Sequence, residues 1–133
     1  MKVMLDTNIC IYLIKRKPAQ VVAKFQEYDL GDIGISSVTV AELQYGVAKS
    51  QQQKQNQQAL DLFLTPLMIA DFDLSAAQHS GQIRAELARQ GTPIGAYDLL
   101  LAGHALSLGV VLVTNNVGEF SRVPNLRVEN WAV

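Results

Sequence analysis

Cysteine is almost absent from this chain of 133 residues, because Cys10 is the only one. A single cysteine excludes an intramolecular disulfide and any metal site built from several thiolates, and it fits a reducing, cytoplasmic compartment. Cys10 lies between two isoleucines, so we interpret it as a small core residue.

Long hydrophobic runs and an excess of one charge are also missing. The most apolar stretch, Leu99–Thr114, is interrupted by His104 and Gly109 and is shorter than the ~20 residues that a membrane span needs. Asp6 and Asn8 interrupt the apolar start of the chain, so it does not read as a signal peptide. The formal net charge is −1, which argues against a generic basic coat for nucleic acid.

Several catalytic motifs are absent as well. The chain has no Gly-rich phosphate loop, no Walker-type lysine and no Gly-x-Ser-x-Gly elbow, so nucleophilic serine or cysteine catalysis has little support. His79 and His104 lie in helical patterns without the spacing of metal ligands, and we interpret both as packing or surface residues.

Apolar residues, by contrast, are plentiful. They make up 49% of the chain, against 17% charged residues, so the core is well supplied. The length is that of one ordinary domain, and we expect residues 1–133 to form a single domain without disulfide support.

Short apolar runs rich in β-branched residues alternate with helical patterns. The predicted strands are Val3–Leu5, Ile33–Ser36, Leu67–Ala70, Val110–Val113 and, as a fifth, Leu126–Val128. The predicted helices are Ile9–Ile14, Ala19–Tyr28, Val40–Lys49, Ala59–Leu64, Ser75–Gln90 with Ser75 as its cap, and Ala96–Leu108. The Gln-rich segment Ser50–Gln58 is either a loop or the solvated start of the next helix. This alternation predicts an α/β fold with a central, mainly parallel sheet of four to five strands, flanked by helices on both faces.

Four acidic residues stand beside apolar segments. Asp6 ends the first predicted strand, Glu119 follows the fourth after a Thr-Asn-Asn turn, and Glu42 and Asp98 lie in apolar-rich helical patterns. Carboxylates in such places are costly unless they are hydrogen-bonded, paired or metal-bound. Ligands of parallel α/β sheets bind beyond the carboxyl ends of the strands, where Asp6 and Glu119 fall. Together the four predict an oxygen-rich pocket for Mg²⁺ or Mn²⁺ and metal-dependent phosphodiester chemistry.

Each acid also has an ordinary explanation. Asp6 is a good helix cap, Glu42 fits a solvent-facing helix position, Asp98 suits the first turn of its helix, and Glu119 fits an exposed turn. The metal site is favoured because one architecture brings all four to a single edge.

Polar neighbours of these acids are open to two interpretations. Thr7, Asn8, Thr114 and Asn116 either orient a water or a substrate phosphate, or serve as caps and turn formers. The basic run Lys15–Lys17 either contacts a phosphate backbone or ends a solvated helix.

Four blocks of the sequence resemble the signature motifs of PIN-domain ribonucleases, and most of all the VapC toxins of bacterial type II toxin–antitoxin systems. The blocks are Met4–Asn8, Ser36–Glu42, Gly95–Ala105 and Val113–Phe120. Each block is short, but their order and spacing are specific, and the resemblance runs from Met4 to Trp131.

This resemblance implies a PIN fold whose acids bind Mg²⁺ or Mn²⁺ and activate a water that cuts RNA. Asp6 and Asp98 would be the principal metal ligands, with Glu42 and Glu119 as further candidates and as the remaining acids of the catalytic centre. Many PIN domains carry an aspartate where this chain has Asn116, a departure that leaves a second metal site and the role of Glu119 open.

The resemblance also implies partners. Such toxins typically form homodimers, are inhibited by a VapB-type antitoxin whose tail enters the active-site groove, and contact operator DNA only through that antitoxin. Their targets are often structured RNAs, frequently tRNA in its anticodon region.

Two other functions remain as alternatives. A catalytically silent PIN-like module would bind RNA or a protein partner, although such a module has no need of four costly acids. A phosphohydrolase with Asp6 as covalent nucleophile would want a second aspartate two residues later, where this chain has Asn8.

Overall fold

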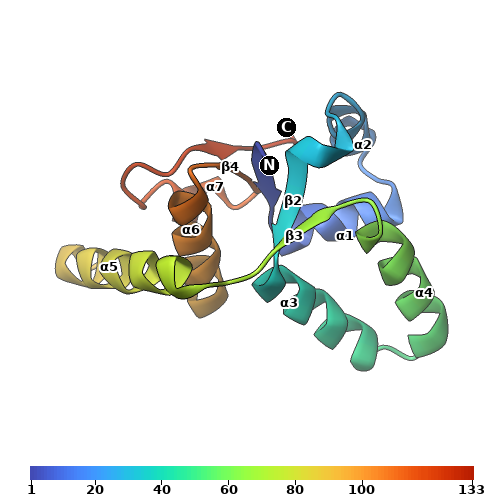
Figure 1. Cartoon of the computed structure of the whole chain (residues 1–133), viewed down its shortest axis with the longest axis horizontal. Coiled ribbons are helices and arrows are strands. Elements are labelled where there is room, and N and C mark those ends of the chain that lie inside the picture. The colour runs from blue at the N-terminus through green and yellow to red at the C-terminus, as the bar shows by residue number, and fades with distance from the viewer.

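A parallel five-stranded sheet stands between two groups of helices in the computed structural model, which describes all of residues 1–133 (Figure 1). Its strands are β1 (Val3–Leu5), β2 (Ile33–Ser36), β3 (Met68–Ala70), β4 (Val111–Val113) and β5 (Val128–Glu129), in the order β3-β2-β1-β4-β5. The helices are α1 (Thr7–Lys15), α2 (Ala19–Gln26), α3 (Ser37–Ala48), α4 (Gln53–Leu64), α5 (Leu74–Gln90), α6 (Ala96–Leu108) and α7 (Val117–Phe120), with a short 3₁₀ turn at Leu30–Asp32. None of the helices is both long and apolar enough to cross a membrane.

Alternating side chains of β1 feed two separate cores. Val3 and Leu5 point to the core shared with α1 to α4, whereas Met4 points to the core shared with α5, α6 and α7. All three side chains are buried because helices cover both faces of the sheet, as the continuous apolar runs of its strands require. The predicted α/β class, parallel sheet and two-sided helical cover are confirmed.

The strand order reverses at β1. The chain places β2 and β3 on one side of β1 and then returns to place β4 and β5 on the other. Leu5 is in register with Val113, and the backbone N–H of Asp6 donates to the Val113 carbonyl at 3.0 Å. Asp6 and Thr114 therefore leave the sheet side by side at its switch point, where crevices of doubly wound sheets lie.

Helices α5 and α6 pack closely. A Cβ atom on Gly103 of α6 would lie only 2.7 Å from the backbone nitrogen of Ser80 and 2.8 Å from its Cα. Only glycine allows this approach, which sets the position of α6 and hence of its first turn at the edge of the sheet.

Three local predictions need correction, and one alternative that the sequence left open is decided. Helix α5 begins one residue earlier than expected, and its cap is Asp73, whose carboxylate accepts from the Ala76 N–H at 3.0 Å, rather than Ser75. Of the two alternatives for the Gln-rich segment Ser50–Gln58, the start of the next helix is confirmed, because α4 begins at Gln53. Glu119 lies in the short helix α7 instead of a turn. The fifth strand is shifted toward the C-terminus, because only Leu112 and Val113 of β4 offer it paired positions.

Candidate active site

Asp6 is the centre of the polar edge. It is 5% exposed, and each of its carboxylate oxygens has a donor. Oδ1 accepts from the backbone N–H of Ile9 at 2.9 Å and so caps α1, while Oδ2 accepts from the hydroxyl of Thr114. Burial raises the pKa of Asp6 above its usual value, and these two hydrogen bonds oppose the rise. Asp6 thus serves both as the N-cap of α1 and as the central acid of the candidate site.

Glu42 is tied to Asp6 through one intervening residue. It lies half-buried on α3, and its Oε1 accepts a 2.7 Å hydrogen bond from the hydroxyl of Thr7, the first residue of α1. Because α1 begins where β1 ends, this bond brings the carboxylate of α3 to the carboxyl edge of the sheet.

Asp98 and Glu119 form the second half of the site around Asn116. The Asn116 side-chain amide donates to Glu119 Oε2 at 2.9 Å and to Asp98 Oδ2 at 3.4 Å. Its backbone N–H donates to the Thr114 hydroxyl at 2.9 Å, so the network continues to Asp6. Asn116 therefore connects Asp98 and Glu119 to the pair formed by Asp6 and Glu42. An asparagine is sufficient for this connection, and an aspartate at position 116 is not required.

The charges of the four acids are only partly offset by basic side chains, since the nearby charge of Arg122 lowers the pKa of Glu119. No salt bridge involves Asp6, Glu42, Asp98 or Glu119. Burial raises the pKa of Asp98 to about 7, and the carboxylates of Glu119, Asp6 and Glu42 add to the rise. The hydrogen bond with Asp98 lowers the pKa of Glu119 below its usual value.

Such a set of oxygens suits a hard divalent cation, which would supply the missing positive charge. In the present side-chain conformations, no three carboxylates, imidazoles or thiols lie close enough together to hold one ion. The donor chemistry and the unbalanced charge fit a metal, whereas the assignment of Asp6, Asp98, Glu42 and Glu119 as its ligands stays a prediction.

The four polar neighbours behave differently from one another. Thr7, Thr114 and Asn116 all donate to carboxylates of the site. Asn8 is exposed, and its side chain makes no hydrogen bond. The first three are thus oriented toward the acids, and the proposed contact of any of the four with substrate stays a prediction.

Sequence reasoning missed two contributions to this edge. Tyr12 of α1 accepts a 2.8 Å hydrogen bond from the Asn115 side chain, which fixes the turn between Thr114 and Asn116. Ser36, at the end of β2, is buried and contacts the imidazole of His104. No local pattern could have revealed either pair, because the partners are 103 and 68 positions apart.

A family model for the PIN domain matches residues 3–126 of this chain. Ribonucleases of this family generally depend on a divalent metal ion. The match spans all four of the acids that the fold brings to one edge.

Curated relatives share about half of their residues with this chain. The tRNA(fMet)-specific endonuclease VapC of Shigella flexneri is 52% identical over 132 residues, covering 99% of each chain. The protein of the same name from Salmonella typhimurium is 49% identical over 131 residues, covering 98% of each. Ribonuclease VapC2 of Haemophilus influenzae is 47% identical over 131 residues, again covering 98% of each.

Solved structures have the same fold. The toxin chain of DNA-bound VapBC from Salmonella typhimurium superposes with a TM-score of 0.93 at 49% identity, covering 98% of each chain. That of VapBC2 from Rickettsia felis, bound to a promoter DNA fragment, superposes at 0.90 with 46% identity, covering 98% of this chain and 99% of that one.

Proposed function

Because this chain belongs to the VapC group of the PIN-domain family, we propose that it is the toxin of a type II toxin–antitoxin system and a metal-dependent endoribonuclease. One observation carries the catalytic part of the proposal. Asp6 lies at the junction of β1 and α1, Glu42 on α3, Asp98 on α6 and Glu119 on α7, and one hydrogen-bonded network links the four, none of which forms a salt bridge. The family match from residue 3 to residue 126 supports treating residues 1–133 as a single PIN domain.

We assign the metal site to Asp6 and Asp98, with Glu42 and Glu119 completing it, and Mg²⁺ as the ion, for which Mn²⁺ would substitute. When bound, such an ion supplies Lewis-acid activation of water and neutralises charge that builds on the phosphate. No protein nucleophile is then required, and this agrees with the absence of a serine or cysteine elbow in the sequence.

The chain's own residues prepare the carboxylates for this task. The Thr114 hydroxyl and the Ile9 N–H hold the Asp6 carboxylate in one orientation. The Asn116 amide does the same for Glu119, and the proton that Asp98 retains near neutral pH leaves when a cation binds. Asp98 therefore gains its full charge only when the metal compensates for it.

The proposed substrate is tRNA, cut in its anticodon region. The support comes from relatives named as tRNA(fMet)-specific endonucleases that match nearly the whole chain. Action on tRNA would place the protein in the cytoplasm.

Cleavage of total cellular tRNA tests this proposal. The purified chain with Mg²⁺ or Mn²⁺ should give discrete fragments that vanish with EDTA and in Asp6→Ala. Asp29→Ala is the matched control, because Asp29 is exposed and remote from the acidic network. Metal binding without cleavage would contradict tRNA as the substrate, and absence of both would favour the silent module. A trapped aspartyl-phosphate on Asp6 would instead favour the phosphohydrolase.

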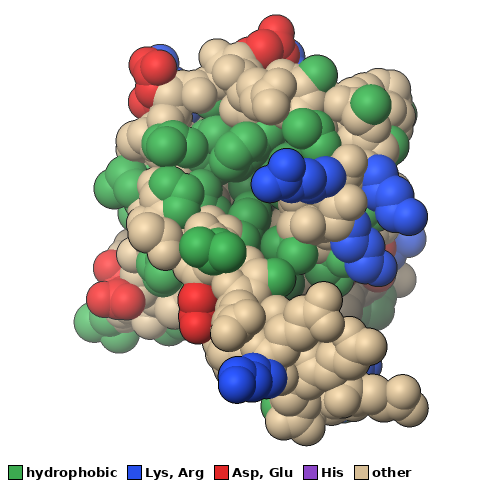
Figure 2. Space-filling model, turned by 90° about the vertical axis from the view of Figure 1, so that its right-hand side faces the viewer, with side chains coloured by type: hydrophobic (Ala, Val, Ile, Leu, Met, Phe, Trp, Pro, Cys, Tyr) green, Lys and Arg blue, Asp and Glu red, His purple; other side chains and the backbone are tan.

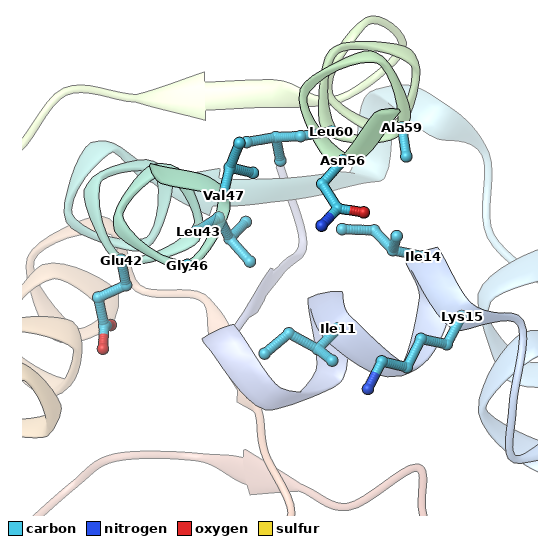
Figure 3. A pocket seen from close by; sticks show the side chains of 10 residues that line it. All are labelled: Ile11, Ile14, Lys15, Glu42, Leu43, Gly46, Val47, Asn56, Ala59 and Leu60. Atoms are coloured by element: carbon cyan, nitrogen blue, oxygen red, sulfur yellow. The ribbon is translucent and has the colours of Figure 1, made fainter. Parts of the chain in front are cut away.

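The proposed protein partner is a VapB-type antitoxin, through which operator DNA would be bound. A groove of about 340 Å³ lies between α1, α3 and α4, and Glu42 stands at one end of it (Figure 3). The groove is lined by Ile11, Ile14, Lys15, Glu42, Leu43, Gly46, Val47, Asn56, Ala59 and Leu60. Hydrophobic side chains gather on this face of the molecule, with Lys and Arg mainly toward the right of the view and Asp and Glu mainly at its upper and left margins (Figure 2). An apolar segment with acidic flanks would fit this surface and reach the active site.

Two equally exposed leucines separate antitoxin binding from general surface effects. Leu62 of α4 lies beside this groove and is 76% exposed, whereas Leu74 of α5 is 74% exposed and lies on the other side of the sheet. Leu62→Glu is expected to weaken capture of a co-expressed VapB-type antitoxin roughly tenfold or more. Leu74→Glu is expected to capture the antitoxin as well as the wild type does. Equal capture by both variants would contradict this surface.

We also propose that the toxin is a homodimer, as the family resemblance implies. Sedimentation velocity of the purified chain tests this, and a single species of monomer mass at micromolar concentration would contradict it.

A further inference from the structure

His104 is a buried titratable residue that the proposed chemistry does not use. It lies in the second half of α6, is 1% exposed, and follows Gly103, the residue of closest approach to α5. A polar ring in such a place is costly unless it has a partner.

The partner of His104 lies where β2 becomes α3. Its Nδ1 is 2.8 Å from the hydroxyl oxygen of Ser36, which is 0% exposed. The same oxygen accepts the Val38 N–H at 3.1 Å and so caps α3. One hydroxyl group therefore joins the start of α3 to the body of α6.

A third segment completes this junction. The His104 ring meets the ring of Phe72 edge-on, with centroids 5.4 Å apart and planes at 81°. The Phe72 backbone N–H donates to the hydroxyl of Ser37 at 3.0 Å. The connection from β3 to α5 is thus held against the same first turn of α3.

The two helices joined in this way carry acids of the proposed active site. Glu42 lies on α3, six residues after Ser36, and Asp98 lies on α6, six residues before His104. The acids themselves are linked only through side chains of other elements, such as Thr7 and Asn116. The His104–Ser36 contact is the buried hydrogen bond that connects the two helices directly.

We propose that His104 is a positioning residue that, through Ser36, fixes α6 relative to α3 and so holds Asp98 at the separation from Glu42 that metal binding requires. This inference rests on the proposed function, because it assumes a metal site between those helices. Displacement of a reacting group by about 1 Å can cost about a hundredfold in rate, so a single buried contact between the helices is enough to matter.

Substitutions at His104 separate this role from simple packing. His104→Asn retains an amide atom close to the position of Nδ1 and can still bond to Ser36, whereas His104→Leu fills similar volume without a polar atom. Val21→Ala is the control, because it removes buried volume at α2, a helix that packs on α1 rather than directly on α3 or α6. Ser36→Ala removes the contact from the other side.

Mn²⁺ titration without RNA, together with kcat and KM for RNA cleavage, provides the test at a temperature well below each Tm. His104→Leu is expected to bind Mn²⁺ about tenfold more weakly and to lose kcat at least about tenfold with little change in KM. His104→Asn should stay within about threefold of the wild type, and Val21→Ala should lower Tm without either loss. The double variant His104→Leu/Ser36→Ala should bind Mn²⁺ no more weakly than the worse single variant.

Two results would overturn the inference in distinguishable ways. If the wild type binds Mn²⁺ and His104→Leu matches Val21→Ala in both readouts, the role of His104 is packing alone and the proposed function stands. If the wild type itself neither binds Mn²⁺ nor cleaves RNA, the proposed function fails, and the positioning role fails with it.

Discussion

At the scale of single residues, this protein uses individual polar groups for two purposes. Asp6 caps α1 with one oxygen and receives Thr114 with the other. Asn116 bonds Asp98 and Glu119 with its side chain and Thr114 with its backbone. Hydrogen bonds of this kind hold each carboxylate in its present place, so the acids must move closer together before three of them can bind one ion.

Cys10 is expected to be inert in the native protein. It is fully buried, and burial, followed by the nearby negative charge of Asp6, raises the pKa of its thiol well above the ordinary value. Because the thiolate is the reactive form, its reaction with a thiol reagent should be at least about a hundredfold slower in buffer than in concentrated guanidinium. The control is an exposed cysteine, Gln78→Cys, made in the Cys10→Ala background. It should react with the reagent at similar rates in buffer and in guanidinium. Fast native labelling of Cys10 would show that the α1 core opens readily.

His104 is expected to make the folded state sensitive to acid. Burial lowers the pKa of His104 below its usual value, although the charges of Asp73 and Asp71 oppose this. The unfolded chain takes up a proton near pH ~6.5 that the folded chain does not yet bind, so stability is complete above that pH and falls as pH drops toward the folded pKa.

Urea midpoints measured between neutral and mildly acidic pH would detect this effect. In His104→Asn, the urea midpoint should fall less steeply with decreasing pH than in the wild type. The matched change of the other histidine, His79→Asn, should leave this pH dependence as it is. A slope that is identical in wild type and His104→Asn would refute the assignment.

At the scale of elements, the close crossing of α5 and α6 determines where the first turn of α6 lies. Gly103 allows the crossing, and the Ser80 hydroxyl, facing it, donates to the Ala76 carbonyl of its own helix at 2.8 Å. The Ser80 hydroxyl is therefore paired within its own helix, and position 103 has no space for a larger residue.

Two alanine substitutions test this crossing. Gly103→Ala would bring a methyl group within 2.8 Å of Ser80 backbone atoms and should destabilise the fold by about 1–3 kcal/mol. Gly81→Ala, next to Ser80 on α5, meets nothing within 4 Å and should stabilise by about 0.5–1 kcal/mol through helix propensity. Urea denaturation of both variants measures these changes. Similar stability of the two would mean that the helices separate without cost.

At the scale of the whole molecule, the active-site edge is assembled from both halves of the chain. Asp6 and Glu42 come from the first third, and Asp98 and Glu119 from the last third, with the sheet between them bringing β1 beside β4. A cation bound by such a set links distant segments, so its binding free energy adds to the stability of the entire fold.

Thermal unfolding with and without Mn²⁺ measures this linkage. At a concentration about a hundredfold above its Kd, Mn²⁺ should add about 2.7 kcal/mol, or roughly 8 °C in Tm. Asp98→Asn should show a much smaller rise in Tm, because one of the two proposed principal ligands is lost. An equal rise in both proteins would remove Asp98 from the metal site.

Local physical chemistry allowed most of the elements to be read from the sequence. The β-branched runs of β1, β2 and β4 and the glycine stops at Gly91 and Gly109 match the structure because strand propensity and left-handed helix ends depend on neighbouring residues. The convergence of the acids was also predictable, since parallel strands end at one edge and Asp6 ends a strand.

Other features depended on competition that a linear reading does not resolve. Asp73 and Ser75 are both residue types that cap helices, and only the structure shows that the Asp73 carboxylate accepts the Ala76 N–H and caps α5. The single turn of α7, which holds Glu119, is too short to show a periodic pattern.

The sequence by itself determined the fold class, the two-sided burial of the sheet and the edge at which the acids meet, because these follow from periodicity and from the direction of parallel strands. Only the tertiary structure decided which groups contact one another there. Thr114 meets Asp6 across 108 positions, and His104 meets Ser36 across 68. Such pairs are set by how helices pack on the sheet, a balance of volumes and hydrogen bonds over the whole core that no local segment contains.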